Sequence, residues 1–140
     1  MATERTLTII KPDSVAAEKI GEIIVTIENS GFRILAMKKL RLSRSDAEAF
    51  YQVHQEKPFF ESLVNFMTEG PVVPIALERE NAIAKLREIM GATDSTKAAA
   101  GTIRNRFGTN IERNAIHGSD AVETAAAELK FFFNETELQT

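Results

Sequence analysis

The segment Thr6-Leu7-Thr8-Ile9-Ile10, followed at once by Lys11-Pro12-Asp13-Ser14, predicts a short β-strand that ends abruptly. The run TLTII is rich in β-branched residues, which favour extended backbone. Pro12 has no backbone N–H to donate to a ladder, so the strand is expected to stop there. Asp13 or Ser14 can then cap the helix that follows.

The rest of the chain continues this alternation of strand and helix. Four isoleucines recur at helical spacing between Ile20 and Ile27, and Gly31 is a suitable C-terminal stop. The further predicted elements are, in order, a strand at 32–42, a helix capped by Ser43, a helix from Pro58 to Met67, a strand at 72–77, a helix at 80–90, a short strand at 115–117 and a helix at 121–133.

The order of these elements is βαβ, two helices, and then βαβα. Two βαβ-like units with short connections favour an α+β fold of the ferredoxin-like type (a βαββαβ sandwich with a four-stranded antiparallel sheet covered by helices) over a doubly wound parallel sheet. We expect one domain over residues 1–140, because no linker or repeat divides the chain. The loop at about 91–113 exceeds the usual connection length, and such loops are commonly functional.

Composition restricts the class of protein. The chain has 140 residues, of which 44% are hydrophobic and 26% charged, as in soluble globular proteins. It has no cysteine and two histidines, which excludes disulfides and argues against a structural zinc site. The polar start is unlike a secretory signal, and no apolar run approaches the roughly 20 residues of a membrane span, so we expect a cytoplasmic protein. A net charge of −3 argues against bulk nucleic-acid binding.

The segment Asn114-Ala115-Ile116-His117-Gly118-Ser119-Asp120 places one of the two histidines in a polar turn. Imidazole, with an unperturbed pKa of roughly 6.5, is substantially neutral at physiological pH. His117 is therefore a candidate nucleophile or proton carrier, although a turn histidine bonded to backbone is an equally good interpretation of these residues alone. For His54, helical spacing from Phe50 favours a structural role.

Three cationic side chains are candidates for binding phosphate: Lys11, Arg87 and Arg104. Each alone is best interpreted as a solvated surface charge, but three converging cations would suit a polyphosphate. The chain contains no GxxxxGK[ST] motif, which excludes a P-loop, and no GxGxxG motif to support a Rossmann site. It has no GxSxG motif either, so Ser119 is a poor nucleophile candidate.

Seven sequence blocks, in order and at matching spacing from about Arg5 to Phe133, resemble the nucleoside diphosphate kinase family, and the short C-terminal end is similar to its bacterial branch. The blocks are Lys11-Pro12-Asp13, Phe50-Tyr51-x-x-His54, Pro58-Phe59-Phe60, Gly70-Pro71-Val72, Met90-Gly91-Ala92-Thr93, Gly101-Thr102-Ile103-Arg104 and Asn114-x-x-His117-Gly118-Ser119-Asp120.

The resemblance implies a mechanism. His117 would attack the γ-phosphate of a nucleoside triphosphate, form a phosphohistidine and pass the phosphoryl group to a nucleoside diphosphate, in ping-pong order. By the same resemblance, Lys11 and Tyr51 would contact the transferred group, and Arg87, Thr93 and Arg104 the other phosphates. Mg²⁺ would be held mainly by those phosphates, with no direct protein ligand.

The resemblance also assigns the remaining site residues. Asn114 and Lys11 would bind the sugar hydroxyls, Phe59 and Ile111 would sandwich the base, and Ser119 and Glu128 would fix the imidazole. Stacking without base-edge hydrogen bonds would explain indifference to the base. The family implies a homo-oligomer, a tetramer or hexamer or possibly a dimer, with no stable nucleic-acid or membrane partner.

Two other functions stay open at this point. A catalytically silent nucleotide-binding or regulatory protein on the same scaffold is disfavoured by the intact Lys11, Arg104, Asn114 and His117 set. A nucleic-acid-binding ferredoxin-like domain would need exposed aromatic residues on its strands, where this chain has mainly isoleucine, leucine and valine.

Several positions depart from the family pattern. Ser95 stands where proline is common, which predicts a looser loop and a less stable assembly. Pro74 lies within a predicted strand, so the ladder must lose a bond or run along an edge. Arg79 replaces a customary glycine, so a turn that needs positive φ would be strained. Lys57 replaces an arginine, and Ala121 a frequent serine.

Overall fold

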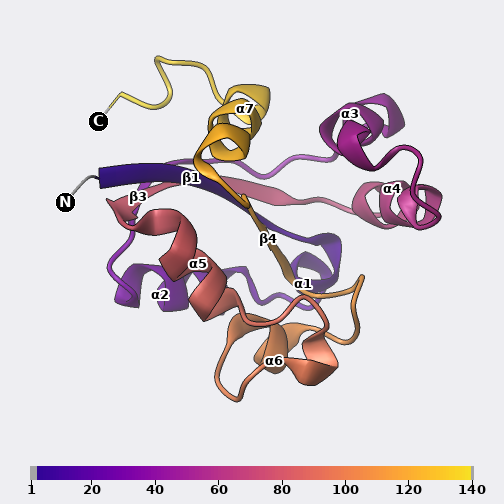
Figure 1. Cartoon of the computed structure of the whole chain (residues 1–140), viewed down its shortest axis with the longest axis horizontal. Coiled ribbons are helices and arrows are strands. Elements are labelled where there is room, and N and C mark those ends of the chain that lie inside the picture. The colour runs from indigo at the N-terminus through magenta and orange to yellow at the C-terminus, as the bar shows by residue number, and fades with distance from the viewer. Residues whose placement is uncertain (1–2, 140) are drawn as a thin grey trace.

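Four strands form one antiparallel sheet in the order β2-β3-β1-β4, with helices on both faces (Figure 1). The computed structural model describes residues 3–139. The strands are β1 (Thr3–Ile10), β2 (Arg33–Met37), β3 (Val73–Glu80) and β4 (Ile116–Gly118). The α-helices are α1 (Pro12–Ala16), α2 (Ile20–Asn29), α3 (Arg44–Phe50), α4 (Phe60–Thr68), α5 (Ala82–Met90), α6 (Ile103–Phe107) and α7 (Val122–Phe132), and two 3-10 turns are η1 (Gln52–His54) and η2 (Ser95–Lys97).

This architecture is the predicted ferredoxin-like α+β fold. The prediction of a single domain over 1–140 stays a prediction, and its residues 1, 2 and 140 lie outside the described part of the chain. Among residues 3–139, no helix has the length and apolar character needed to cross a bilayer.

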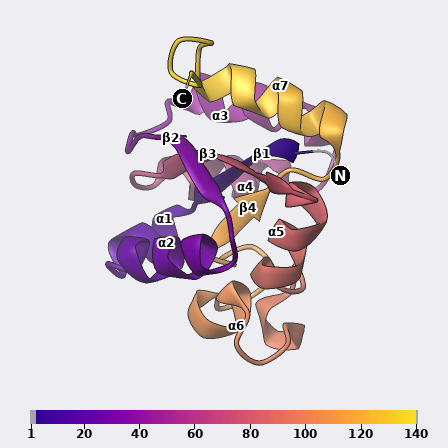
Figure 2. The same cartoon turned by 90° about the vertical axis from the view of Figure 1, so that its left-hand side faces the viewer.

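The sheet separates two apolar clusters because successive side chains of a strand point to opposite faces. Leu7 and Ile9 of β1 belong to the cluster beneath α3, α4 and α7, whereas Ile10 belongs to the cluster with α2 and α5. Figure 2 shows α7 and α3 on one side of the sheet and α2 and α5 on the other. β1 is therefore buried on both faces, as its apolar run predicts.

Pro74 explains why the predicted strand at 32–42 is shorter in the structure. The Lys38 amide donates to the Pro74 carbonyl at 3.2 Å, but Pro74 has no N–H to return the second bond of an antiparallel pair. β2 accordingly ends at Met37, and pairing resumes only as a single bridge between Leu40 and Val72. The prediction that the ladder loses a bond at Pro74 is confirmed, although β3 lies inside the sheet rather than at its edge.

The prediction of strain at Arg79 was wrong. Arg79 lies within β3, paired with Glu4 of β1, and is not among the residues with positive φ. In the turn between β3 and α5, the residue with a left-handed backbone conformation is Asn81, with φ 54°. Asparagine tolerates this conformation better than most residues, so the turn is accommodated two positions later.

Several predicted helix starts are also corrected. Neither Asp13 nor Ser14 caps α1: its N-cap is Lys11, with Pro12 at the first helical position and no side-chain cap. The helix expected from Pro58 begins at Phe60, and the one expected at 80 begins at Ala82 because Glu80 still belongs to β3. The predicted cap at Ser43 is confirmed, since its hydroxyl accepts from the Asp46 amide at 3.1 Å.

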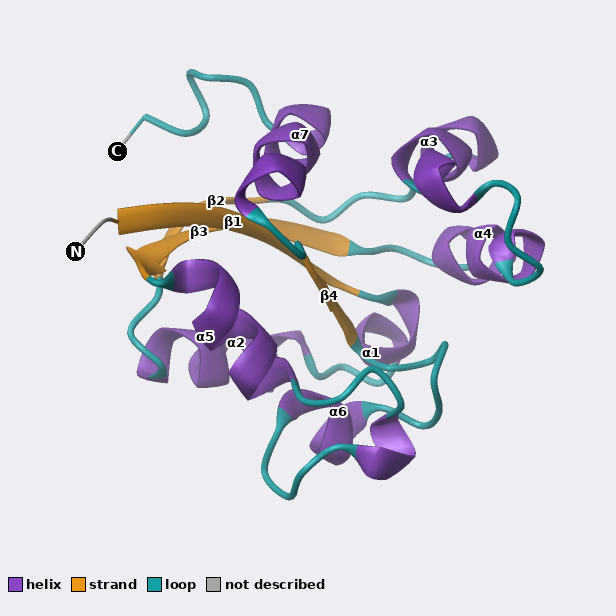
Figure 3. Ribbon diagram, in the orientation of Figure 1, coloured by secondary structure: helices purple, strands orange, loops and turns teal. Residues whose placement is uncertain are grey.

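The loop at 91–113 contains two short helical segments, η2 and α6, although most of it is irregular (Figure 3). Side chains cap both: Asp94 accepts from the Thr96 amide, and Thr102 from the Asn105 amide. Ser95 is buried, and its hydroxyl has no hydrogen-bond partner among the described residues. An unsatisfied buried hydroxyl is unfavourable, which is consistent with the predicted weakening of this loop; the effect of Ser95 on stability stays a prediction.

Gly118 allows α5 to pack closely on β4. An ideal Cβ at this position would lie 2.5 Å from Met90 Sδ and 3.0 Å from Leu86 Cδ2. We therefore expect Gly118→Ala to lower the free energy of unfolding by about 1–3 kcal/mol through overpacking. Gly21→Ala is the matched control: Gly21 lies in α2 with no atom within 4 Å of its added Cβ. It should raise stability by up to about 1 kcal/mol. Urea unfolding followed by circular dichroism measures both, and equal stabilities of the two variants would contradict this packing.

Candidate active site

One cavity of about 440 Å³ gathers ten of the eleven site residues predicted from the sequence. Those ten are Lys11, Tyr51, Phe59, Arg87, Thr93, Arg104, Ile111, Asn114, His117 and Glu128. The eleventh, Ser119, is fully buried behind the wall and reaches the cavity through Glu128. The lining residues come from the segment after β1 and from α3, η1, α4, α5, the 91–113 loop, β4 and α7, so the cavity exists only in the folded chain.

His117 is held at the centre of this cavity by strand pairing and by α7. It lies opposite Ile9 in the β1–β4 ladder, so its ring points to the same face of the sheet as Ile9, towards α7. Its Nε2 lies 2.8 Å from Glu128 Oε1, and the Ser119 hydroxyl donates to the same oxygen at 2.7 Å. The ring nitrogen Nδ1 has no hydrogen-bond partner among residues 3–139.

The electrostatics of Glu128 fix the imidazole tautomer. Burial would raise the pKa of this carboxyl, but the hydrogen bonds from His117 and Ser119 oppose burial, and the pKa lies below its ordinary value. An ionised carboxylate only accepts hydrogen bonds, so His117 Nε2 carries the proton that lies between them. Nδ1 then keeps a free lone pair.

Lys11 and Asn114 form a buried polar pair at the end of β1. Lys11 Nζ donates to Asn114 Oδ1 at 2.7 Å, and the Asn114 amide donates to the carbonyls of Thr93 and Ile111 at 3.0 and 3.1 Å. Burial and the nearby positive charge of Arg104 lower the pKa of Lys11 to about 8, against the opposing effects of Asp13 and Glu112. The ammonium is therefore poorly solvated and poised to bind an anion.

Arg104 is also buried, and two backbone carbonyls orient it. Its two terminal nitrogens donate to Gly91 O at 3.1 Å and Ile116 O at 2.8 Å, while its Nε is buried without a partner among the described residues. Burial and repulsion from Arg87 lower the pKa of Arg104 to about 10. Arg87 itself is more exposed and forms an ion pair with Asp120 at 2.8 Å. The three candidate cations, Lys11, Arg87 and Arg104, therefore line one cavity.

Tyr51 contributes a buried hydroxyl to the cavity. Its side chain is 6% exposed, and its Oη is buried without a hydrogen bond among the described residues. Burial, followed by the negative charge of Glu128, raises the pKa of Tyr51 well above its ordinary value, so the group stays a neutral donor. Its ring lies edge-on to that of His117, with centroids 6.3 Å apart.

The outer part of the cavity is apolar and exposed. Phe59 is 46% exposed and Ile111 is 64% exposed, on opposite segments of the chain. His54, which the sequence pattern assigned to a structural role, lies between Tyr51 and Phe59, with ring centroids 6.5 and 5.5 Å away. Exposed apolar side chains beside a cationic interior suit a ligand with an aromatic end and an anionic end.

The sequence did not assign two acidic residues of the cavity wall, Glu112 and Asp120. Glu112 accepts a hydrogen bond from Ser62 on α4 at 3.0 Å, and Asp120 pairs with Arg87. Asp120 was visible only as part of the turn that contains His117, and Glu112 had no sequence signal of its own.

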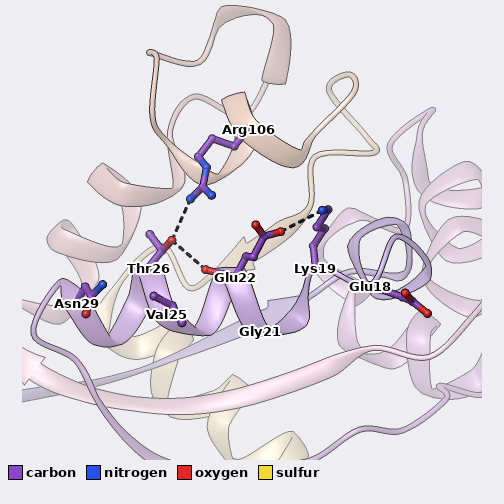
Figure 4. Close-up of a pocket in the computed structure, with 8 residues that line it drawn as sticks. All are labelled: Glu18, Lys19, Gly21, Glu22, Val25, Thr26, Asn29 and Arg106. Carbon is purple, nitrogen blue, oxygen red and sulfur yellow. Dashed lines mark hydrogen bonds and ion pairs between the residues drawn. The ribbon is translucent and has the colours of Figure 1, made fainter.

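A second, shallower hollow along α2 gathers no comparable chemistry. Figure 4 shows Arg106 reaching across it to Thr26, and Lys19 paired with Glu22. The other side chains that line it include exposed Val25 and Asn29. The candidate active site is therefore the cavity around His117.

Comparisons with known proteins agree with this geometry. The family model described as nucleoside diphosphate kinase matches residues 4–138. A nucleoside diphosphate kinase of an Anaeromyxobacter species is 56% identical over 140 residues, which cover 100% of this chain and 96% of that protein. One from a Nitratiruptor species is 58% identical over 135 residues, 96% of this chain and 98% of the relative.

Solved structures give the same result. The Aquifex aeolicus nucleoside diphosphate kinase superposes with a TM-score of 0.96 at 46% identity, covering 99% of this chain and all of that one. The enzyme of Halobacterium salinarum, solved in complex with CDP, superposes with a TM-score of 0.95 at 38% identity over 99% and 93% of the two chains. The chain belongs to the nucleoside diphosphate kinase family.

Proposed function

We propose that the chain transfers the γ-phosphate of a nucleoside triphosphate to a nucleoside diphosphate through a phosphohistidine on His117, and so maintains nucleoside triphosphate pools. The observation that carries the proposal is the hydrogen bonding of the two ring nitrogens of His117. Its Nε2 is engaged by Glu128, while Nδ1 is left without a partner among the described residues, beside Lys11, Arg87 and Arg104. A neutral nitrogen in a cationic cavity is a nucleophile suited to an anionic phosphoryl group.

Glu128 and Ser119 act on the nucleophile. When Nδ1 attacks the γ-phosphorus, the P–O bond to the β-phosphate breaks and the nucleoside diphosphate leaves. The ring gains positive charge, which the carboxylate at Nε2 stabilises. The Ser119 hydroxyl donates to the same oxygen and keeps the carboxylate ionised and oriented. On return transfer to a nucleoside diphosphate, the P–N bond breaks and the imidazole recovers its starting tautomer.

The cations and Tyr51 act on the phosphates. Lys11 and the Tyr51 hydroxyl contact the transferred phosphoryl group, whose charge spreads over its equatorial oxygens in the transition state. Arg104 and Arg87, with Thr93, hold the remaining phosphates. Among the described residues, the two carbonyl bonds of Arg104 leave one N–H on each terminal nitrogen without a partner.

The sugar and base contacts follow the polarity of the cavity. The Asn114 amide is held by two carbonyls, and its Oδ1 has a lone pair left for a sugar hydroxyl beside Lys11. Phe59 stacks on one face of the base and Ile111 packs on the other. The relative from Halobacterium salinarum was solved with CDP, a nucleoside diphosphate.

Nucleotide kinases of this family generally need a divalent cation, and we propose Mg²⁺. The described residues contain no group of three or more histidine, aspartate or glutamate side chains that could hold a metal ion. Of the cavity carboxylates, Asp120 is 79% exposed in its side chain and is the one best placed to assist. This donor set fits Mg²⁺, which commonly combines one or two carboxylates with substrate phosphates and water. The cation would neutralise charge on the phosphates.

The rival function, a catalytically silent nucleotide-binding protein, is not favoured. Binding alone would not require the buried chain of hydrogen bonds from Ser119 through Glu128 to His117. The homo-oligomeric state, whether tetramer, hexamer or dimer, and the cytoplasmic location stay predictions. Light scattering measures the first.

A labelling experiment tests the covalent intermediate. Wild-type protein incubated with γ-labelled ATP should take up an acid-labile, base-stable label, which GDP then discharges. His117→Ala should take none, because the nucleophile is removed. His54→Ala is the matched control, since His54 is the only other histidine, and it should still be labelled. Equal labelling of His117→Ala and wild type would refute the mechanism.

The pKa of Lys11 predicts a basic limb in the pH profile. Because that pKa is lowered to about 8, the free protein loses the ammonium as the pH rises through about 8. The kcat/KM for nucleoside triphosphate, the substrate that meets the unphosphorylated protein, should then fall, since kcat/KM reports groups of the free enzyme. Lys11→Arg keeps its charge over this range and should lack this limb. A wild-type profile that is flat from pH 7 to 9 would contradict the assignment.

A further inference from the structure

Asp13 lies outside the cavity wall, yet it contacts the turn between two proposed site residues. Its Oδ2 accepts a hydrogen bond from the Ala115 amide at 3.0 Å. The Lys11 amide donates to the carbonyl of the same residue, Ala115, at 2.9 Å. The short segment from Lys11 to Asp13 therefore binds both the N–H and the C=O of Ala115.

Ala115 has an unfavourable backbone conformation. Its φ is 74°, and the Ile116 amide donates to the Asn114 carbonyl at 2.8 Å across it. These features define a γ-turn of the positive-φ type with alanine at its centre, a turn that is rare and strained for an L-residue. Such strain persists only when the surrounding structure holds the turn in place. Here the holding contacts come from Asp13 and from the Lys11 backbone.

The turn connects Asn114, which pairs with Lys11, to β4, which carries His117. A relaxed turn would move the Asn114 side chain from Lys11 and change the entry of β4 into the sheet. We propose that Asp13 is a positioning residue of the active site: its partly buried carboxylate holds the strained turn at Ala115 and so keeps Lys11 and Asn114 in place. The inference rests on the proposed function, since it concerns the geometry of that same site.

The charge of Asp13 has a second effect, on Lys11. The charged groups that act on the Lys11 ammonium are Arg104 from α6, Asp13 from α1 and Glu112 from the loop before β4. Burial and Arg104 lower the pKa of Lys11, while Asp13, more strongly than Glu112, raises it. The other carboxylate oxygen of Asp13 is buried without a hydrogen bond among the described residues. Burial raises the pKa of Asp13 itself.

Two substitutions separate these effects. Asp13→Asn keeps an oxygen that accepts from the Ala115 amide but removes the charge, whereas Asp13→Ala removes both. Asp46→Asn is the matched control, because Asp46 is likewise an acidic residue in the first turn of a short helix, α3, but is exposed and does not line the cavity. The kcat/KM of each variant is measured from pH 6 to 9, with the unfolding midpoint recorded in parallel.

We expect Asp13→Ala to lower kcat/KM at pH 7 by about tenfold or more, as for the loss of a charged hydrogen-bond partner. Asp13→Asn should restore most of this activity at pH 7, while its basic limb moves to lower pH than in wild type. Asp46→Asn should match wild type in kcat/KM at pH 7 and in the position of the basic limb. If Asp13→Ala fails to fold, the shift of the basic limb in Asp13→Asn still tests the proposal.

The proposal is overturned if folded Asp13→Ala retains wild-type kcat/KM, or if the basic limb of Asp13→Asn coincides with that of wild type. Failure of wild-type protein to take up label from γ-labelled ATP would instead refute the proposed function. Normal labelling of wild type together with unaltered Asp13 variants would refute this inference alone.

Discussion

The antiparallel pairing of β1 with β4 is the interaction on which the active site depends. Its three residue pairs join segments more than 100 positions apart, Thr8 with Gly118, Ile9 with His117 and Ile10 with Ile116. The Thr8 hydroxyl adds a bond of 2.6 Å to the His117 carbonyl, and the Lys11 amide extends the contact to Ala115. This short ladder helps to bring His117, the proposed nucleophile, into the same cavity as the buried Lys11. Moreover, a slip of one residue would turn His117 to the opposite face of the sheet, away from Glu128.

The two faces of β4 contact different helices, and this explains why a histidine and a glycine are adjacent in the strand. His117 points towards α7, where Glu128 and Ser119 set its tautomer. Gly118 faces α5, where Met90 and Leu86 leave no room for a Cβ. The cations come from elements that the same packing brings together, since Arg104 donates to the carbonyl of Ile116 in β4. Core packing and phosphate chemistry are therefore coupled through one three-residue strand.

Local sequence patterns predicted many of the helices and strands. They could not predict contacts between segments that are far apart in the sequence. The apolar run before Pro12 and the spacing of the α2 isoleucines were sufficient to place β1 and α2. The strand expected at 32–42 was too long because nothing in that segment shows that a proline lies opposite Lys38. Arg79 was expected in a turn, whereas the chain turns at Asn81. Residues that line the cavity were identified through their family motifs, and Asp13 was assigned to a helix cap because its contact with Ala115 spans 102 positions.

The central claim is that His117 carries the phosphoryl group on Nδ1 while Glu128 holds Nε2. The most direct test is nitrogen-15 NMR of protein labelled in its imidazole rings and phosphorylated by ATP. The hydrogen bond between Nε2 and Glu128 predicts phosphorus coupling at Nδ1 of His117, with a proton retained on Nε2. Phosphorus coupling at Nε2, or at either nitrogen of His54, would contradict the account.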